Sequence, residues 1–284
     1  MKKFLFGCGA QKTGTTWLAK NFKNSPEYWN GGIKEWRFWK YYFDNNSRLL
    51  QLREMKKGLH EIHDSYPLMN MKKLKWRISV LQHPESFLRD VVDNFIAKVN
   101  VKVLGDMTPS NGILEIEEFS FIKEYFNKRG IIVKPLLILR DPFERIWSAA
   151  RMKIKNHYSV EYQKNGQFVN EMLLETYRLK TVEKRTRYEH IIENLERVFD
   201  EQDICYEFSE NLFSQDSLDR VSSHLGISNI TVDNCSPNPS PKLTVVPTQI
   251  RQEIINFYRD TYLSVFDKFG DDAKEFWTDS FKLL

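Results

Sequence analysis

A glycine-rich loop between an apolar run and a helical pattern is the feature that most constrains this chain. It lies in the stretch FLFGCGAQKTGTTWLAKNF, residues 4–22. Residues 3–8 form a short apolar run that predicts a buried strand, and Trp17, Leu18 and Phe22 have the spacing of one helix face. A strand, a glycine turn and a helix in this order predict the first unit of an α/β fold with a parallel sheet.

The loop has the glycine spacing of a nucleotide phosphate-binding loop, which reads G-x-x-x-x-G-K-[ST]. Gly9 and Gly14 match this spacing, but Thr15 stands where the pattern has lysine, and Lys12 lies earlier in the loop. The backbone amide groups of such a loop, together with the start of the following helix, bind an anion. The displaced lysine argues against a triphosphate bound with magnesium and favours a shorter anion chain.

The rest of the chain alternates further strands and helices. Valine-rich or apolar runs at 101–106, 131–142 and 204–209 predict three more strands, and the run at 131–142 has the continuous apolar character of a strand covered on both faces. We therefore expect one domain, residues 1–284, with a three-layer, P-loop-like α/β fold. Its central parallel sheet is flanked by helices, with a helical insertion at about residues 40–100.

Cap and turn residues indicate where several helices begin and end. Thr108 followed by Pro109 predicts one helix start, and Pro142 predicts another. Gly226 predicts the end of the helix SQDSLDRVSSHLG. The segment PTQIRQEIINFYRDTYLSVFDKFG, residues 247–270, predicts one long final helix.

A second candidate anion site lies in the segment LRDPFERIWS. Arg140 ends the most apolar strand, Asp141 and Pro142 open a helix, and Ser148 follows about two turns along it. Open α/β folds bind ligands at the carboxyl ends of their strands, and arginine forms bidentate bonds to phosphate. The pattern predicts a phosphate site at Arg140, although Arg-Asp-Pro alone fits a structural cap equally well.

Together, GAQKTGTTW and LRDPFERIWS resemble the sulfotransferase family, especially its carbohydrate-type, heparan-sulfate-type and bacterial members. The resemblance implies a P-loop-like fold and the co-substrate 3′-phosphoadenosine 5′-phosphosulfate (PAPS), with no metal required. It places the 5′-phosphosulfate at the first loop and the 3′-phosphate at the arginine and serine. By position, it assigns to the nucleotide the residues Gln11, Lys12, Thr13, Gly14, Thr15, Thr16, Trp17, Arg140, Ser148, Tyr188 and Lys242.

Three of these assignments have specific grounds or alternatives. Trp17 resembles a tryptophan that stacks on adenine in cytosolic members, but a core position at the helix start explains it nearly as well. Tyr188, in RYEHIIENL, falls where relatives often place a tyrosine near the nucleotide. Lys242 follows the proline-rich SPNPSP and is a candidate for a flap that grips the nucleotide.

The segment GGIKEWRFW contains the candidate catalytic base. Carbohydrate-type members carry Lys-Glu before an aromatic pair, shortly after the first helix, and Lys34 and Glu35 match that position. Burial among the following aromatic residues predicts a raised pKa for Glu35, which suits a general base. A surface Lys-Glu pair on a helix is the alternative, and a histidine base, as in cytosolic members, stays open, with His60, His63 and His83 available but in no matching motif. The resemblance also implies that Lys12 stabilises the leaving phosphate.

Two other functions remain open from the sequence. A P-loop nucleotide or small-molecule kinase would need a magnesium-binding aspartate, for which Asp106 is a candidate, and a non-catalytic nucleotide-binding module would need no base. The segment GDMTPSN resembles the GE-K-(S/T)-P-x-Y segment of carbohydrate-type members, with Met107 in place of a lysine. The expected acceptor is a hydroxyl or amine of a carbohydrate or small molecule, and its identity and the oligomeric state stay undetermined.

Composition narrows the partners and the location. A net charge of +4 fits anionic small molecules and does not require nucleic acid. No apolar run approaches the ~20 residues of a membrane span. Three widely separated cysteines, with no C-x-x-C pair, favour a reducing compartment and thus the cytoplasm. The histidines of HEIH, His60 and His63, have no third ligand beside them and fit a solvated helix face.

Overall fold

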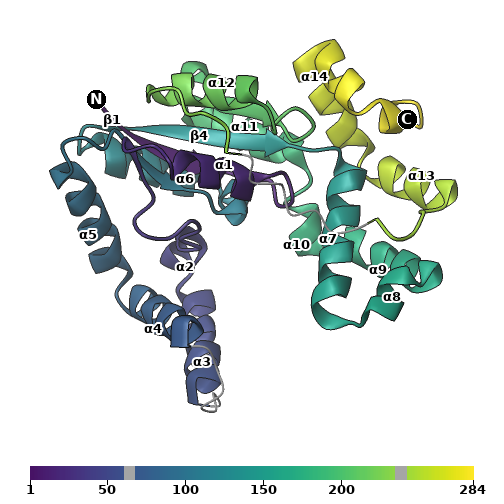
Figure 1. Ribbon diagram of the computed structural model, residues 1–284, viewed down its shortest axis with the longest axis horizontal. Helices are drawn as coiled ribbons and strands as arrows, with labels where there is room; N and C mark the ends of the chain where they lie inside the picture. The colour runs from purple at the N-terminus through teal and green to yellow at the C-terminus, as the bar shows by residue number, and fades with distance from the viewer. Residues whose placement is uncertain (61–67, 234–241) are drawn as a thin grey trace.

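A five-stranded sheet, in which every neighbouring pair is parallel, forms the centre of the computed structural model (Figure 1). The structure describes residues 1–60, 68–233 and 242–284. The strand order is β2-β3-β1-β4-β5. The strands are β1 (Lys2–Gly7), β2 (Tyr28–Trp29), β3 (Val103–Asp106), β4 (Ile131–Leu139) and β5 (Cys205–Phe208).

Helices connect the strands and cover both faces of the sheet. Their bounds are α1 (Thr15–Phe22), α2 (Trp39–Phe43), α3 (Asn45–His60), α4 (Leu68–Gln82), α5 (Pro84–Ala97), α6 (Ile116–Asn127), α7 (Pro142–His157), α8 (Val160–Lys164), α9 (Gly166–Tyr177), α10 (Lys180–Glu183), α11 (Tyr188–Val198), α12 (Gln215–Leu225), α13 (Thr248–Phe257), α14 (Arg259–Phe276) and α15 (Thr278–Phe281). Two short 3₁₀ helices, η1 (Pro109–Ile113) and η2 (Glu201–Asp203), complete the described elements.

The alternating side chains of β1 explain the three layers. Successive residues of a strand point to opposite faces of a sheet. Phe4 and Phe6 enter one buried cluster with side chains of α6 and α11, whereas Leu5 enters a second cluster with side chains of α1 and α12. The central strand is therefore buried on both faces, and the expected three-layer α/β fold is confirmed.

Two predicted helices differ in the structure. The helix predicted to begin at Pro109 is a 3₁₀ turn followed by a break, and α6 begins at Ile116 with a capping box between Glu115 and Glu118. The capping box satisfies the first amide groups of α6, so the helix begins there. The predicted single final helix is divided into α13 and α14 at Tyr258, which has non-helical torsion angles.

Other predicted boundaries are confirmed. Helix α7 begins at Pro142, and Asp141 accepts a hydrogen bond from the amide group of Glu144 as its cap. Helix α12 ends at Gly226, which adopts the left-handed conformation with φ of 66°. The sequence did not predict β2, because two residues carry no alternating pattern.

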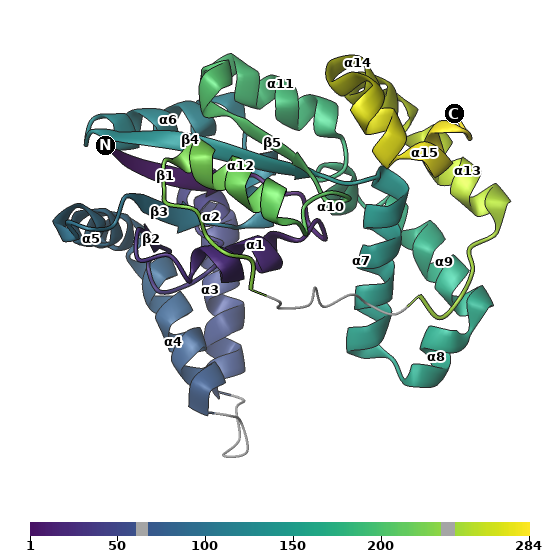
Figure 2. The ribbon, with the colours of Figure 1, turned by 45° about the horizontal axis from the view of Figure 1, so that its top comes forward.

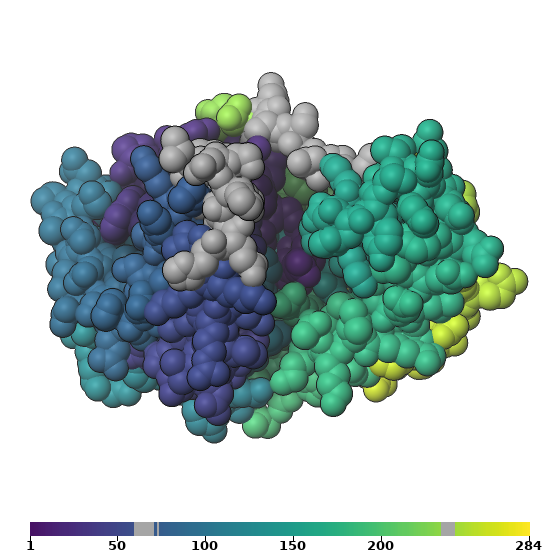
Figure 3. All heavy atoms as spheres, turned by 90° about the horizontal axis from the view of Figure 1, so that it is seen from below, coloured from purple at the N-terminus to yellow at the C-terminus, as the bar shows by residue number. Residues whose placement is uncertain are grey.

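Helices α2 to α5 lie between β2 and β3 in the chain, where the helical insertion was predicted. Helices α3 and α4 pack against each other and project away from the sheet (Figures 1 and 2). Helix α7 projects on the other side, with α8, α9 and α13 beside it (Figure 2). Seen from below, the molecule is hollowed between these two projections (Figure 3).

Candidate functional site

A cavity of about 1290 Å³ lies at the carboxyl edge of the sheet. Gln11 and Lys12 follow β1, Thr108 follows β3, Arg140 follows β4 and Ser209 follows β5, and all five line the cavity. Parallel strands bring their carboxyl ends to one edge, so loops distant in sequence meet there. The projecting helices α3, α4 and α7 also contribute lining residues.

Positive charge dominates the lining of this cavity. Three carboxylates line it, those of Glu35, Glu144 and Glu210. They face ten basic side chains: Lys12, Lys20, Lys34, Arg37, Lys40, Arg77, Arg140, Arg151, Arg185 and Lys242. A recess lined mainly by one sign of charge attracts ligands of the opposite sign, so this cavity suits an anion.

The loop after β1 adopts conformations that glycine favours. Gly9 and Gly14 have φ angles of 103° and 96°. A Cβ atom at Gly14 would lie 2.6 Å from Cδ2 of Leu212, so only glycine fits there without displacing a neighbour. Lys12 also has a positive φ, 72°, which is uncommon for a residue with a side chain. The loop thus turns tightly into the start of α1.

Lys12 and Arg140, from the two candidate anion sites, are directly connected. The guanidinium Nη1 of Arg140 donates a hydrogen bond of 2.7 Å to the backbone carbonyl of Lys12. Burial lowers the pKa of Lys12, and the positive charges of Arg140, Arg151 and Lys155 lower it further. A cation in this position gains stability when an anion binds beside it.

The threonines of the loop have different roles. The hydroxyl of Thr13 is buried and donates to the carbonyl of Ala10 at 2.7 Å, so it closes the loop and does not line the cavity. Thr15 and Thr16 line the cavity at the start of α1, where amide groups lack intrahelical acceptors. Their hydroxyls accept hydrogen bonds from Nζ of Lys34 at 3.4 and 2.8 Å.

Trp17 is a core residue that also borders the cavity. Only 5% of the residue is exposed, and it belongs to the buried cluster beneath α1. The residue nevertheless lines the cavity, and its ring makes an edge contact with Phe213 at 5.5 Å between centroids. Stacking of this ring on adenine stays a prediction.

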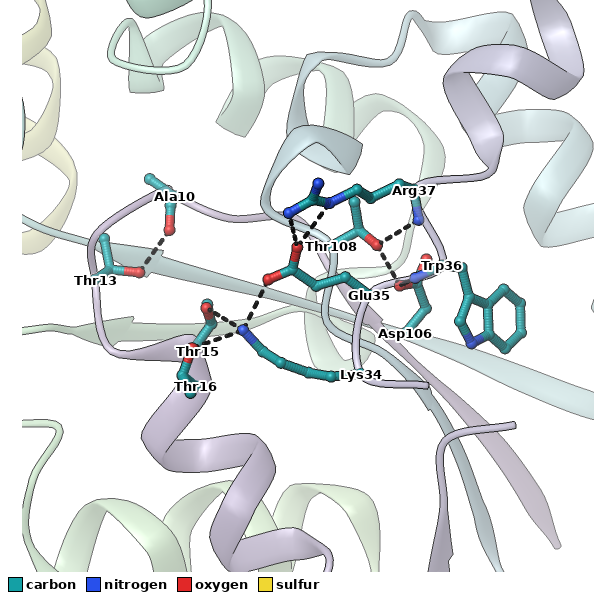
Figure 4. A network of polar contacts seen from close by, with 10 residues as sticks. All are labelled: Ala10, Thr13, Thr15, Thr16, Lys34, Glu35, Trp36, Arg37, Asp106 and Thr108. Carbon is teal, nitrogen blue, oxygen red and sulfur yellow. Dashed lines mark hydrogen bonds and ion pairs between the residues drawn. The ribbon is translucent and has the colours of Figure 1, made fainter. Parts of the chain in front are cut away.

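Glu35 lies between two cations at the mouth of the loop (Figure 4). One carboxylate oxygen accepts from Nζ of Lys34 at 2.9 Å, and the other accepts from Nε of Arg37 at 3.0 Å. Burial pushes the pKa of Glu35 upward, but the hydrogen bonds and charges of Lys34 and Arg37 outweigh it and lower the pKa below its ordinary value. The predicted raised pKa is wrong, because the sequence reasoning counted burial but not the two cations, Lys34 and Arg37, that outweigh it.

Asp106 holds the segment that carries Glu35. Its carboxylate is fully buried and accepts hydrogen bonds from the amide group of Trp36 at 3.0 Å and the hydroxyl of Thr108 at 2.5 Å (Figure 4). Asn111 donates to the other oxygen at 3.0 Å, and Thr108 accepts from the amide group of Arg37. Burial raises the pKa of Asp106 to about 6. The end of β3 thus orients Glu35 from about 70 residues away in the chain.

The arginine–serine pair of the second candidate anion site also lies at the cavity. Arg140 and Ser148 both line it, and Ser148 is 4% exposed. Glu144 lies one turn after Arg140 and pairs with Nζ of Lys242 at 3.0 Å, which brings the predicted flap residue to the cavity. Tyr188 is fully buried and donates to the carbonyl of Arg140 at 2.9 Å. It therefore supports Arg140 from behind and does not line the cavity.

Sequence reasoning missed Arg151, one turn beyond Ser148 on α7. It lines the cavity and is 8% exposed, and its Nε and Nη1 atoms have no hydrogen-bond partner within the described residues. Its guanidinium lies over the ring of Trp147 at 4.2 Å, and burial lowers its pKa to about 10. Arg151 follows Ser148 by three positions, so the two residues share one helix face. This spacing is the sequence signal that could have identified Arg151.

Two further predictions concern metal ions and membranes. In the ranges 1–60, 68–233 and 242–284, no group of three histidine, cysteine or acidic residues is placed to hold a metal ion. His63 and the proline-rich residues 236–241 lie outside the described residues, as does the side chain of His60. Within the same ranges, no helix is both long and apolar enough to cross a membrane.

Comparisons with known proteins support the fold. The chain is similar in structure to a sulfotransferase from Alicyclobacillus acidocaldarius, with a TM-score of 0.58 and 14% sequence identity. The match covers 94% of this chain and 95% of the other. No protein-family model matches the sequence, and no curated protein matches it. At 14% sequence identity, the structural similarity shows that the two chains share an α/β fold.

Proposed function

We propose that this protein transfers a sulfuryl group from PAPS to a hydroxyl or amine of a carbohydrate or small-molecule acceptor. The observation that carries the proposal is the meeting of two candidate anion sites in one cavity. Lys12 and the start of α1 would hold the 5′-phosphosulfate, and Arg140 and Ser148 would hold the 3′-phosphate. The hydrogen bond from Arg140 to the carbonyl of Lys12 connects the two sites, as one doubly phosphorylated ligand requires.

The chemistry follows from the residues of the cavity. The acceptor oxygen or nitrogen forms a bond to sulfur while the bond from sulfur to the phosphate oxygen of PAPS breaks. Glu35 takes the acceptor proton, and its lowered pKa keeps it ionised at neutral pH. The departing phosphate oxygen gains negative charge, which Lys12, the cation of the loop, stabilises. Lys34 connects the two ends, because its Nζ contacts both Glu35 and Thr16.

The kinase alternative loses its magnesium ligand. Asp106 was the candidate, but both of its oxygens are buried and engaged by Trp36, Thr108 and Asn111, and it does not line the cavity. The non-catalytic alternative is disfavoured by Glu35, which is ionised and half-buried beside the loop. We also propose a cytoplasmic location, which the free thiols of Cys8 and Cys205 support.

The first prediction concerns ligand specificity. Adenosine 3′,5′-bisphosphate, without metal, is expected to raise the thermal stability of the protein, since a ligand at 100 times its Kd adds about 2.7 kcal/mol. ATP with magnesium is expected to add much less, because Thr15 stands where a kinase has lysine. Differential scanning fluorimetry measures both. Stabilisation by ATP and magnesium alone would contradict the proposed function.

The second prediction concerns the 3′-phosphate. Arg140→Ala is expected to weaken binding of adenosine 3′,5′-bisphosphate by about 10–100-fold, because a hydrogen bond to a charged group contributes about 1.5–3 kcal/mol. Binding of adenosine 5′-monophosphate is expected to weaken much less, because it loses only the support that Arg140 gives the loop through the carbonyl of Lys12. Calorimetric titration of both nucleotides tests this, with the exposed Arg89→Ala of α5 as the control. Equal weakening for both nucleotides would remove Arg140 from the 3′ site.

A further inference from the structure

Six of the basic side chains that line the cavity fall into two groups. Lys12, Arg140 and Arg151 form the first, since the charges of both arginines act on Lys12. Arg37, Arg77 and Arg185 form the second, since the charge of Arg37 acts on both of the others. In the proposed function the first group holds PAPS, so the second group has no assigned ligand.

The second group comes from three parts of the chain and lines the cavity that Glu35 also lines. Arg37 lies on the segment that carries Glu35, Arg77 comes from α4 of the insertion, and Arg185 lies between α10 and α11. All three line the same cavity as Glu35. The tertiary structure therefore concentrates positive charge where the acceptor must approach the base.

These arginines are poorly compensated by the protein. Arg37 pairs with Glu35, but that carboxylate is already shared with Lys34. Neither Arg77 nor Arg185 forms an ion pair within the described part of the chain, and the charge of Glu35 offsets only part of the burial of Arg77. Arg185 donates one hydrogen bond, of 3.4 Å, to Gln11, and its Nε atom is buried with no partner among the described residues.

An anionic ligand would supply the negative charge that Arg77 and Arg185 lack. Taking a guanidinium out of water costs free energy unless an anion compensates it, and burial lowers the pKa of both Arg77 and Arg185. The planar guanidinium of arginine matches the geometry of carboxylate, sulfate and phosphate groups. A neutral acceptor would leave these two cations partly desolvated and unpaired.

We infer that the acceptor is an anion, with a carboxylate or sulfate group that binds Arg77 and Arg185 while its hydroxyl or amine lies at Glu35. This inference rests on the proposed function, because it takes Glu35 as the base that marks the acceptor position. The tyrosine and glutamine that border the same region, Tyr41 and Gln51, are joined by a hydrogen bond of 2.9 Å and offer polar contacts to a sugar.

The test compares three sugars that differ only at carbon 6. Galactose, galacturonic acid and galactose 6-sulfate are titrated into the protein saturated with adenosine 3′,5′-bisphosphate, and dissociation constants are measured by NMR. At least one anionic sugar is expected to bind about tenfold or more tightly than galactose, and the two arms separate carboxylate from sulfate preference. Equal binding of all three sugars, or no binding by either anionic sugar, overturns the inference.

Matched variants test whether Arg77 and Arg185 cause the preference for the anionic sugar. Arg77→Gln and Arg185→Gln are each expected to lose most of the preference for the anionic sugar, while Lys75→Gln keeps it. Lys75 is exposed on the same helix as Arg77 and does not line the cavity, so it controls for net charge. If Arg77→Gln and Lys75→Gln lose the preference for the anionic sugar equally, the inference is overturned. The net positive charge of the protein would then explain the preference.

A nucleotide-binding measurement distinguishes failure of this inference from failure of the proposed function. Binding of adenosine 3′,5′-bisphosphate to the unaltered protein and to Arg77→Gln is measured first, and both are expected to bind it with similar affinity. Absence of binding to the unaltered protein would contradict the proposed function itself. The same sugars titrated without nucleotide then test the anion site alone, with the same outcomes supporting or overturning it.

Discussion

Glu35→Gln is expected to lower the rate of sulfuryl transfer by about 10²–10⁴-fold, the usual contribution of a general base. Glutamine has the same shape but cannot take the acceptor proton. The measurement is PAPS-dependent turnover with an acceptor identified by its mass gain in a screen of glycans and phenols. Affinity for adenosine 3′,5′-bisphosphate is expected to be retained, which shows that the variant folds.

A matched control is Glu54→Gln, an exposed glutamate on α3. It removes the same charge and is expected to leave turnover unchanged. Full activity of Glu35→Gln would exclude Glu35 as the base. The pH dependence gives a second readout, because Lys34 and Arg37 lower the pKa of Glu35 below its ordinary value of 4.5. The carboxylate stays ionised through neutral pH, so its contribution to the rate is lost only as the pH falls through this lowered pKa.

Lys12→Met is expected to lower kcat by about 10²–10³-fold, comparable to the loss of one donor that stabilises a developing negative charge. Methionine has similar length, and the positive φ of position 12 is equally uncommon for both side chains. The variant therefore removes the cation without a new demand on the loop. Steady-state kinetics with saturating PAPS measure kcat separately from donor binding.

The control for Lys12 is Lys23→Met, at an exposed lysine that follows α1. It is expected to have wild-type kinetics. An unchanged kcat with only a raised KM for PAPS in Lys12→Met would mean that Lys12 binds donor and transition state equally. That outcome would contradict its assignment to the departing phosphate.

Much of the α/β fold could be predicted from local patterns. The apolar runs that became β1, β3, β4 and β5 are short and bounded by turn residues, and these features depend only on near neighbours in the chain. The predicted helix at Pro109 was wrong because the capping box at Glu115 and Glu118 specifies a later start. Competing local signals of similar strength cannot be ranked without the packing that selects one of them.

For the candidate site, the sequence predicted which residues lie nearby but not where all of their side chains point. Lys12, Glu35 and Arg140 were identified by position in motifs, and the structure places all three around one cavity. Thr13 and Tyr188 were assigned to the nucleotide, but their side chains point into the protein, where they support the loop and Arg140. A motif specifies which residues occur near a site, whereas side-chain direction depends on contacts with distant elements.

By itself, the sequence determined the order of strands and helices, the glycine loop with its displaced lysine, and the spacing from Arg140 to Ser148, since each depends on residues close together in the chain. Only the tertiary structure decided the electrostatics. Lys34 and Arg37 lower the pKa of Glu35, Asp106 holds its segment from another strand, and Arg77 and Arg185 come from separate elements to line the same cavity. Charge interactions depend on distance and burial in space, and these follow from how the sheet and its projecting helices pack.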